Sequence, residues 1–190
     1  MKNLFITVFL FVFAPVTFAA ADVNVDLYGG LSGAGDLERL SIVGLNLSMG
    51  IHRDVDLMLK TAYGWRFETG TPDDEKFTQM SGMVCLQHHF RITELPLVWI
   101  NTVGAGGSKA GRSYNVSSIE SDDEDYLGFE FALYTGILYH ATQKLAPYLE
   151  LGYHMMTSML GSAPFDVNGF QALIGVRYTF GHNQSIFSDY

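Results

Sequence analysis

From residue 23 onwards, apolar and polar side chains alternate along the chain with a period of two. This period predicts β-strands with two unlike faces, because successive side chains of a strand point to opposite sides. The stretch Val23–Tyr28 shows the pattern first, with valine and leucine at the odd positions and Asn24 and Asp26 between them. Seven further segments follow, and one of them, 96–105, is apolar without a clear phase. The seven are 43–51, 57–68, 79–90, 96–105, 129–140, 148–155 and 170–180.

The connections between these eight segments alternate in length. The breaks at 52–54, 91–95 and 141–146 are short. The breaks at 33–39, 68–76, 106–127 and 157–166 are longer and richer in Gly, Ser and Asp. Short turns at one end and long loops at the other are typical of outer-membrane barrels, whose short turns are periplasmic. A strand needs about 9 to 11 residues to cross the bilayer, so the chain has room for eight strands and not for sixteen.

Large aromatic side chains gather on the apolar face of the segments. They are Tyr63, Trp65, Phe67, Phe129, Phe131, Tyr139, Tyr153, Phe170, Tyr178 and Phe180. The opposite face carries Gly, Asn, Ser and isolated charges. The lumen of an eight-stranded barrel is only wide enough for side chains to fill it, so the aromatic face is expected outside, against lipid. We therefore predict an all-β fold: an eight-stranded antiparallel up-and-down transmembrane β-barrel. A soluble barrel of the opposite polarity is the alternative.

The N-terminus has the layout of a signal peptide. Lys2 supplies a positive charge, an apolar run extends from Leu4 to Phe13, and Pro15 precedes the small residues Ala19, Ala20 and Ala21. The run is too short for a membrane anchor. We expect residues 1–21 to be removed on export, residues 22–180 to form the barrel in the outer membrane, and residues 181–190 to form a short periplasmic tail.

The composition narrows the classes of function. Charged residues make up 16% of the chain, against about a quarter in a typical soluble domain. The net charge of −9 argues against a nucleic-acid binder, and the single Cys85 excludes an internal disulfide framework. His88 and His89 are adjacent, so they should point to opposite faces of a strand rather than share a metal. We expect neither a metal nor a cofactor.

The layout over residues 22–180 resembles the OmpA/OmpX-like family of small outer-membrane barrels. The last segment, Gly175–Phe180, resembles the aromatic-ended strand that the outer-membrane insertion machinery recognises in that family. The resemblance implies that Gly175, Tyr178 and Phe180 form an insertion signal. In the family the final aromatic residue often ends the chain, whereas here Gly181 to Tyr190 follow it.

Seven charged residues fall on the polar face of the predicted strands. They are Asp26, Asp56, Lys60, Arg66, Glu130, Glu150 and Arg177. If the first and last strands close antiparallel, Asp26 and Arg177 lie near the same end and can pair. Buried charges must be paired, because an unpaired one costs several kcal/mol. These residues therefore predict either a plug of ion pairs in the lumen or, as the alternative, a narrow path for small solutes.

An enzyme that modifies lipid A is a third possibility, since some of these enzymes are eight-stranded barrels. Glu150, His154 and Ser158 share one face of a strand, but residues four apart on a strand are separated by about 13 Å. A nucleophile and its base must lie within roughly 3 Å, so these three side chains cannot form a triad. Deacylases of this kind would require a His-x-Ser tripeptide in the last two strands, and the sequence has none there.

Acidic residues cluster in the predicted loop 106–127. They are Glu120, Asp122, Asp123, Glu124 and Asp125. Their spacing lacks the glycine and terminal glutamate of an EF-hand. The cluster is either a solvated loop or a site where divalent cations bridge the protein to lipopolysaccharide. We expect a monomer with a structural, surface-interaction or adhesion role, in contact with outer-membrane lipid and, through loop 106–127, with an extracellular ligand.

Overall fold

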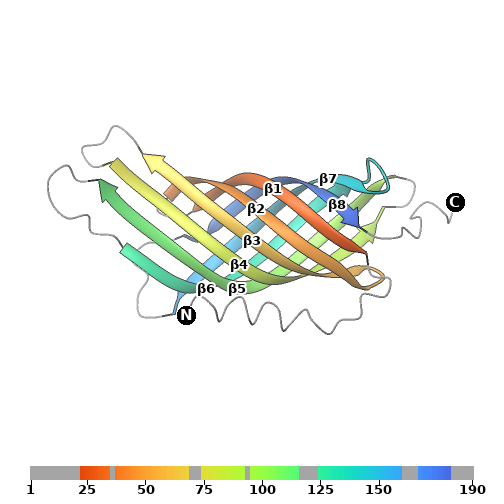
Figure 1. Cartoon of the computed structure of the whole chain (residues 1–190), viewed down its shortest axis with the longest axis horizontal. Helices are drawn as coiled ribbons and strands as arrows, with labels where there is room; N and C mark the ends of the chain where they lie inside the picture. Colours follow the sequence, from red (N-terminus) through yellow and green to blue (C-terminus); the bar gives the residue numbers. More distant parts are fainter. Residues whose placement is uncertain are drawn as a thin grey trace.

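The computed structural model describes residues 22–34, 37–68, 74–92, 95–115, 124–159 and 167–180, and these residues form a closed barrel of eight strands (Figure 1). The strands are β1 Val23–Ala34, β2 Leu37–His52, β3 Val55–Glu68, β4 Asp74–Arg91, β5 Leu97–Asn115, β6 Glu124–Tyr139, β7 Leu145–Ser158 and β8 Gly169–Phe180. The predicted signal peptide 1–21 and the predicted tail 181–190 lie outside the described residues.

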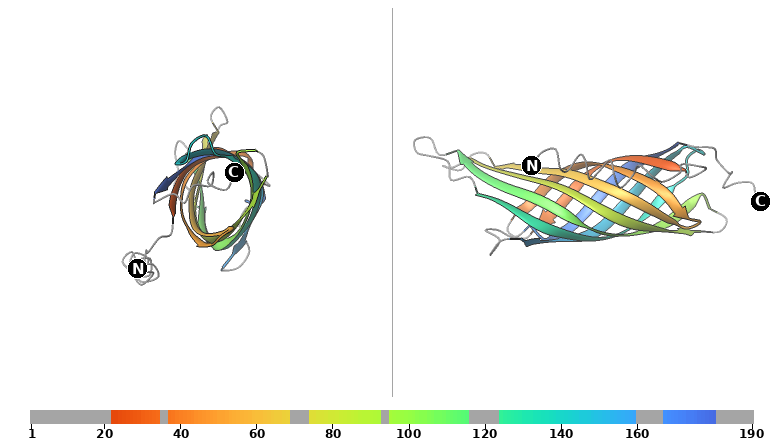
Figure 2. Two further views of the ribbon diagram at one scale, coloured as in Figure 1. Left: turned by 90° about the vertical axis from the view of Figure 1, so that its right-hand side faces the viewer. Right: turned by 60° about the horizontal axis from the view of Figure 1, so that its bottom comes forward.

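Each strand pairs antiparallel with the next one along the chain, and β1 pairs with β8 to close the barrel, as the views along and across its axis show (Figure 2). The predicted fold, an eight-stranded antiparallel up-and-down barrel, is confirmed. Among the described residues there is no helix that is long and apolar enough to cross a membrane. We call the end with the short connections 53–54, 92–96 and 140–144 the turn end, and the opposite end the loop end.

The strands differ in length, and the predicted loops are wrong in extent. β4 and β5 have 18 and 19 residues, whereas β1 and β8 have 12 each, so β3 to β6 extend furthest at the loop end (Figure 1). Residues 106–115 and 124–127, predicted as loop, belong to β5 and β6. The paired backbone continues there because ladder hydrogen bonds do not require apolar side chains. Residues 97–105 of the segment 96–105, which has no clear phase in the sequence, are the first half of β5.

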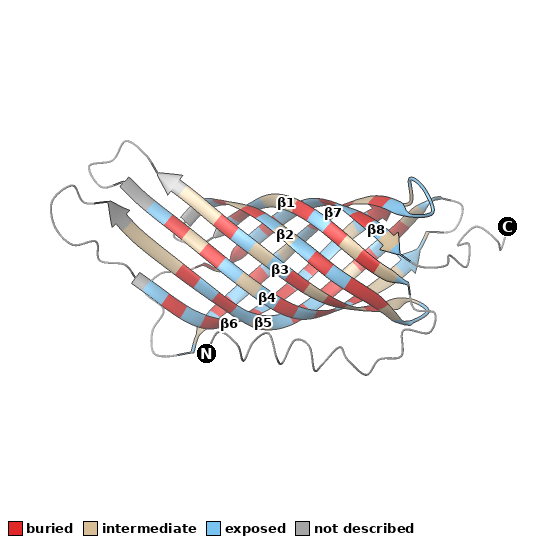
Figure 3. Cartoon of the chain, in the orientation of Figure 1, coloured by how far each residue is buried: buried red, intermediate tan, exposed pale blue. Residues whose placement is uncertain are grey.

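Burial alternates along most of each strand (Figure 3). The exposed positions carry the apolar stripes: Leu27 is 68% exposed, Leu133 63% and Phe170 74%. An apolar belt around the whole barrel greatly exceeds the apolar patches that soluble monomers leave in water. The face prediction is therefore confirmed, with the apolar and aromatic stripes outside.

The lumen is less polar than predicted, because it also contains aromatic rings. Tyr28, Tyr134 and Tyr148 are buried inside the barrel with Met58, Met83, Ile100 and Leu173. Each tyrosine lies opposite a glycine of the neighbouring strand: Tyr28 opposite Gly44, Tyr134 opposite Gly152 and Tyr148 opposite Gly175. A Cβ atom on any of these glycines would overlap the tyrosine ring. The glycines on the polar face thus make room for rings that a narrow lumen would otherwise not accept.

Candidate functional site in the lumen

Near the turn end, Arg177 of β8 and Asp26 of β1 form a buried bidentate ion pair. Arg177 Nε donates to Asp26 Oδ1 at 2.8 Å, and Nη2 donates to Oδ2 at 2.9 Å. The two residues are register partners where β1 and β8 close the barrel. This fork geometry gives the strongest kind of charge-assisted hydrogen bond. It joins the first strand to the last.

Asp56 of β3 lies beside this pair and shares its positive charge. Its Oδ2 atom is 3.7 Å from Arg177 Nη1 and 3.4 Å from His89 Nε2, and it accepts a hydrogen bond from Asn24 Nδ2 at 3.3 Å. His89 therefore points into the lumen, whereas His88 is on the outer face, as their adjacency predicts. Asp56 has no cation of its own, so it depends on several weaker contacts.

A second ion pair lies deeper in the barrel, between Lys60 of β3 and Glu150 of β7. Lys60 Nζ donates to Glu150 Oε2 at 3.0 Å, and both side chains are 2% exposed. The ammonium group also lies 4.0 Å from the centre of the Tyr134 ring and 4.8 Å from that of Tyr28. Cation–π contact of this kind is worth about 2 kcal/mol when desolvated. The tyrosines thus help to hold a lysine inside the barrel.

Gln87 of β4 connects the two ion pairs. Its Oε1 atom accepts a hydrogen bond from Arg177 Nη2 at 2.7 Å, and its Nε2 atom donates to Glu150 Oε1 at 3.4 Å. Arginine can only donate and an ionised carboxylate can only accept, so both bonds fix the same orientation of the Gln87 amide. Thr102 Oγ1 also donates to Glu150 Oε1, at 3.3 Å. The charges of β1, β3, β7 and β8 therefore form one connected network.

Towards the loop end, Glu130, His154 and Ser32 form a third group. His154 Nδ1 is 3.5 Å from Glu130 Oε1, without the alignment of a hydrogen bond, and His154 Nε2 is 3.3 Å from Ser32 Oγ. Sequence reasoning places His154 in the lumen but does not find these partners, which come from β6 and β1. Ser158 and Glu150 are not the partners of His154. The order acid, imidazole, hydroxyl resembles a hydrolase triad, but all three residues are fully buried.

The enclosed space in this part of the lumen is very small. The hollow beside Lys60, Glu130, Tyr134 and Gln171 has a volume of about 10 Å³, which is the space that one water molecule requires. Above it, Leu40, Phe77, Ala110, Tyr126, Met156 and Val167 form an apolar cluster. Ser32 is itself fully buried, so its hydroxyl group is not accessible from solvent. The described lumen is therefore filled on the loop-end side of its charged network.

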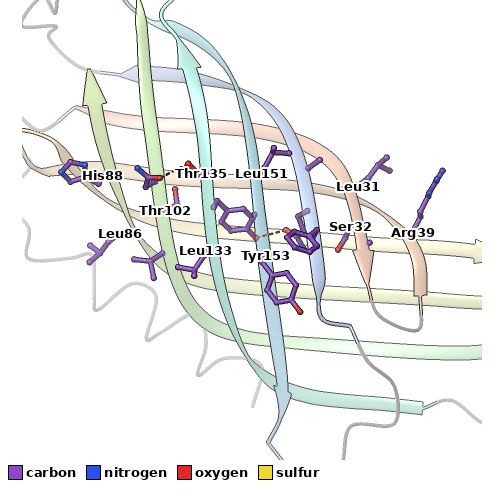
Figure 4. A pocket seen from close by; sticks show the side chains of 18 of the residues that line it. Leu31, Ser32, Arg39, Leu86, His88, Thr102, Leu133, Thr135, Leu151 and Tyr153 are labelled. Carbon is purple, nitrogen blue, oxygen red and sulfur yellow. Dashed lines mark hydrogen bonds between the residues drawn. The ribbon is translucent and has the colours of Figure 1, made fainter. Parts of the chain in front are cut away.

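A larger hollow lies against the outer wall. It is lined mainly by outward side chains such as Leu31, Leu86, Leu133, Leu151 and Tyr153 (Figure 4). Within the described residues there is also no group of three or more His, Cys, Asp or Glu side chains that could hold a metal.

The structure brings most of the predicted lumen charges together. Asp26, Asp56, Lys60, Glu130, Glu150 and Arg177 are all buried in the lumen. Arg66 lies on the same face of β3 but is half-buried and six residues beyond Lys60, a distance of roughly 20 Å along the strand. The sequence pattern assigns Arg66 to the correct face but cannot give its depth relative to the network.

The other predicted residues lie at the surface or outside the described residues. Tyr178 and Phe180 point outward with their rings 4.7 Å apart, whereas Gly175 lies in the lumen against the Tyr148 ring. Their role as an insertion signal stays a prediction. Glu124 begins β6, and Asp125 is exposed and forms an ion pair with Lys109 at 2.6 Å. Glu120, Asp122 and Asp123 lie outside the described residues.

Solved structures provide the comparison for this barrel. No family model matches the chain, and no curated protein sequence matches it. A major outer membrane protein of Thermus thermophilus has a TM-score of 0.63 at 11% identity, over 85% of this chain and all of the other. Neisserial surface protein A has a TM-score of 0.58 at 15% identity, over 84% of this chain and 97% of the other.

The attachment invasion locus protein Ail of Yersinia pestis, in complex with the heparin analogue sucrose octasulfate, has a TM-score of 0.58 at 16% identity. The match covers 85% of this chain and 99% of Ail. The chain has the fold of the small outer-membrane β-barrels. The expected resemblance is thus confirmed for the fold, and it supports the outer membrane as the location of this barrel. At these identities the likeness does not extend to a ligand or an activity.

Proposed function

We propose that this protein is an outer-membrane surface protein whose barrel holds it in the membrane without conducting solutes. Its loop end contacts lipopolysaccharide or an extracellular ligand. The observation that carries the proposal is the filled lumen. The two buried ion pairs and Gln87 cross the lumen, and the hollow beside Lys60 holds about one water molecule. A solute would have to break at least one of these pairs, and an unpaired buried charge costs about 3–5 kcal/mol. The narrow channel is therefore the weaker candidate.

The loop end provides the surface for such contacts. The strands β3 to β6 extend furthest at the loop end. The exposed residues Arg39, Lys76 and Lys109 point outward near this end. Cations at this level suit the phosphate groups of lipopolysaccharide. The likeness to Ail and to Neisserial surface protein A agrees with a surface-interaction or adhesion role, although it identifies no ligand.

We propose no catalytic role for Ser32, His154 and Glu130. A hydrolase needs its hydroxyl group within reach of the substrate, and Ser32 is fully buried beneath the apolar cluster. Lipid A from cells that express the protein should therefore have the same mass spectrum as lipid A from cells that do not. A lost acyl chain that returns with Ser32→Ala would contradict this part of the proposal.

Uptake into vesicles tests whether the barrel conducts solutes. Liposomes containing the folded protein should swell in solutions of small sugars and amino acids no faster than empty liposomes, while a porin in the same lipid swells rapidly. A rate that rises with the amount of protein would favour the narrow channel.

Binding to vesicles with and without lipopolysaccharide tests the loop end. Arg39→Gln combined with Lys109→Gln should weaken the preference for lipopolysaccharide, and an unchanged preference would argue against this contact.

A further inference from the structure

The lipid-facing wall carries one row of polar side chains near the turn end. His88 of β4 is the register partner of Asn101 of β5, and Asn101 is the register partner of Thr135 of β6. Figure 4 shows His88 and Thr135 on this wall. In the turn-end half of the described strands, the other exposed polar side chains apart from tyrosines are His52 and Arg91, each next to a turn, and Thr61, which donates to the Leu45 carbonyl at 2.9 Å. The row is thus a single polar feature in an apolar belt.

The hydrogen bonds within the row use the acceptor oxygen of Asn101 but not its N–H donors. Trp99 Nε1 and Thr135 Oγ1 both donate to Asn101 Oδ1, at 3.2 Å and 2.9 Å. An indole N–H can only donate, so this bond fixes which atom of the Asn101 amide is oxygen. An amide oxygen has two lone pairs, and both are now used. The two N–H groups of Asn101 Nδ2 have no hydrogen-bond partner among the described residues, and Asn101 is on the outward face of β5 with the exposed Trp99 and Val103.

The depth of the row matches a particular layer of the membrane. Trp99, Phe90 and Tyr139 are 43%, 54% and 47% exposed and lie at the turn ends of their strands, where aromatic girdles mark the level of the lipid headgroups. Asn101 lies two residues beyond Trp99, about 7 Å further along the strand. This is where the headgroups give way to the acyl chains, and the glycerol ester carbonyls lie there. Beyond the row, Leu86, Val103 and Leu133 form an apolar surface.

We propose that this row binds the ester carbonyl oxygens of a phospholipid in the periplasmic leaflet, with an acyl chain against Leu86, Val103 and Leu133. Ester carbonyls only accept hydrogen bonds, so they complement the free donors of Asn101. A second copy of this chain would present the same donors and an acceptor that is already saturated, so it does not complement the row. An N–H group without a partner is unfavourable in hydrocarbon, so a hydrogen bond to a carbonyl oxygen stabilises the bound lipid. The inference rests on the proposed outer-membrane location.

Bilayers of diester and diether phospholipids with the same headgroup and chain length test the proposal, because the diether lipid lacks the carbonyls. The folding equilibrium constant of the wild-type protein should be roughly three- to tenfold lower in the diether bilayer, as expected for one or two lost hydrogen bonds. Asn101→Leu should fold equally well in both. Thr61→Val is the matched control, since Thr61 is outward but bonded within the barrel, and it should keep the wild-type difference. The proposal would be overturned if Asn101→Leu showed the same difference in folding equilibrium constant between the two bilayers, or if the wild-type protein showed no difference.

A direct measurement covers the case in which Asn101→Leu does not fold. Wild-type protein with ¹⁵N-labelled asparagine side chains, in diester lipid with ¹³C-labelled carbonyls, should show a short-range ¹⁵N–¹³C coupling by solid-state NMR that Asn101→Asp lacks. No coupling, or coupling to a second labelled copy of the protein instead, would overturn lipid binding by this row. Failure of the protein to insert into either bilayer would contradict the proposed function itself, so the two failures are distinguishable.

Discussion

The two halves of the lumen are filled by different means. In the turn-end half, each of the two buried cations has its own carboxylate: Arg177 pairs with Asp26, and Lys60 pairs with Glu150. In the loop-end half, Glu130 faces only a histidine, its Oε2 atom has no hydrogen-bond partner, and an apolar cluster fills the remaining space. Ion pairs therefore stabilise the turn-end half of the lumen, and apolar packing stabilises the loop-end half. Mutations of similar chemistry should thus have unequal effects in the two halves.

The largest effect is expected from Arg177→Met. It leaves Asp26 buried without its cation, which should lower the free energy of unfolding by about 3–5 kcal/mol. The double variant with Asp26→Leu removes both charges and should recover most of this loss. Reversible urea unfolding in lipid vesicles measures both. If the two single effects simply added in the double variant, the pair would not be coupled.

Glu150→Gln and Glu130→Gln compare the two halves with the same substitution. Glu150→Gln removes the partner of Lys60 and should destabilise the barrel by several kcal/mol. Glu130→Gln removes a buried negative charge that no fixed cation neutralises, so the free energy of unfolding should stay within about 1 kcal/mol of the wild type. The same unfolding assay measures both variants. Equal losses would show that the two halves are held in the same way.

Gly152→Ala tests how the rings fit into the lumen. The added methyl group would overlap the Tyr134 ring, which also contacts Lys60. Overpacking of this kind costs about 1–3 kcal/mol. Gly82→Ala is the matched control on β4, where an added Cβ meets nothing within 4 Å. If both variants were equally stable, the tyrosine–glycine pairs would not be close-packed.

The smallest effect is expected at the turn after β6. Burial, together with the positive charges of Arg177 and Arg91, lowers the pKa of His140 below its ordinary value of 6.5. The unfolded chain then binds this proton more readily, so stability falls as the pH drops through about 6.5. His140→Asn should flatten that part of the stability profile between about pH 7.5 and about pH 5.5. If the stability of His140→Asn fell with decreasing pH as steeply as that of the wild type, His140 would not be the source of this pH dependence.

The fold follows from the sequence because the period of two assigns each side chain to a face without knowledge of tertiary structure. The Asp26–Arg177 pair is predictable for the same reason, since closure places the first strand beside the last. The predicted loops are too long because Gly and Ser continue the strands beyond the apolar belt, as residues 106–115 show.

Contacts across the lumen are not predictable in this way. Lys60 and Glu150 come from β3 and β7, and Ser32 and His154 come from β1 and β7. These pairs meet because of the diameter and the stagger of the closed barrel, which local alternation does not contain. The period of two places Tyr134 and Tyr148 on the lumen face, but it does not show which glycine accommodates each ring, because that glycine lies on another strand.

The central claim is that the charged network closes the lumen, and single-channel recording in planar bilayers tests it most directly. The wild-type barrel, inserted at high protein density, should give no reproducible conductance steps over the usual voltage range. Reproducible steps of uniform size from the wild-type protein would contradict the account.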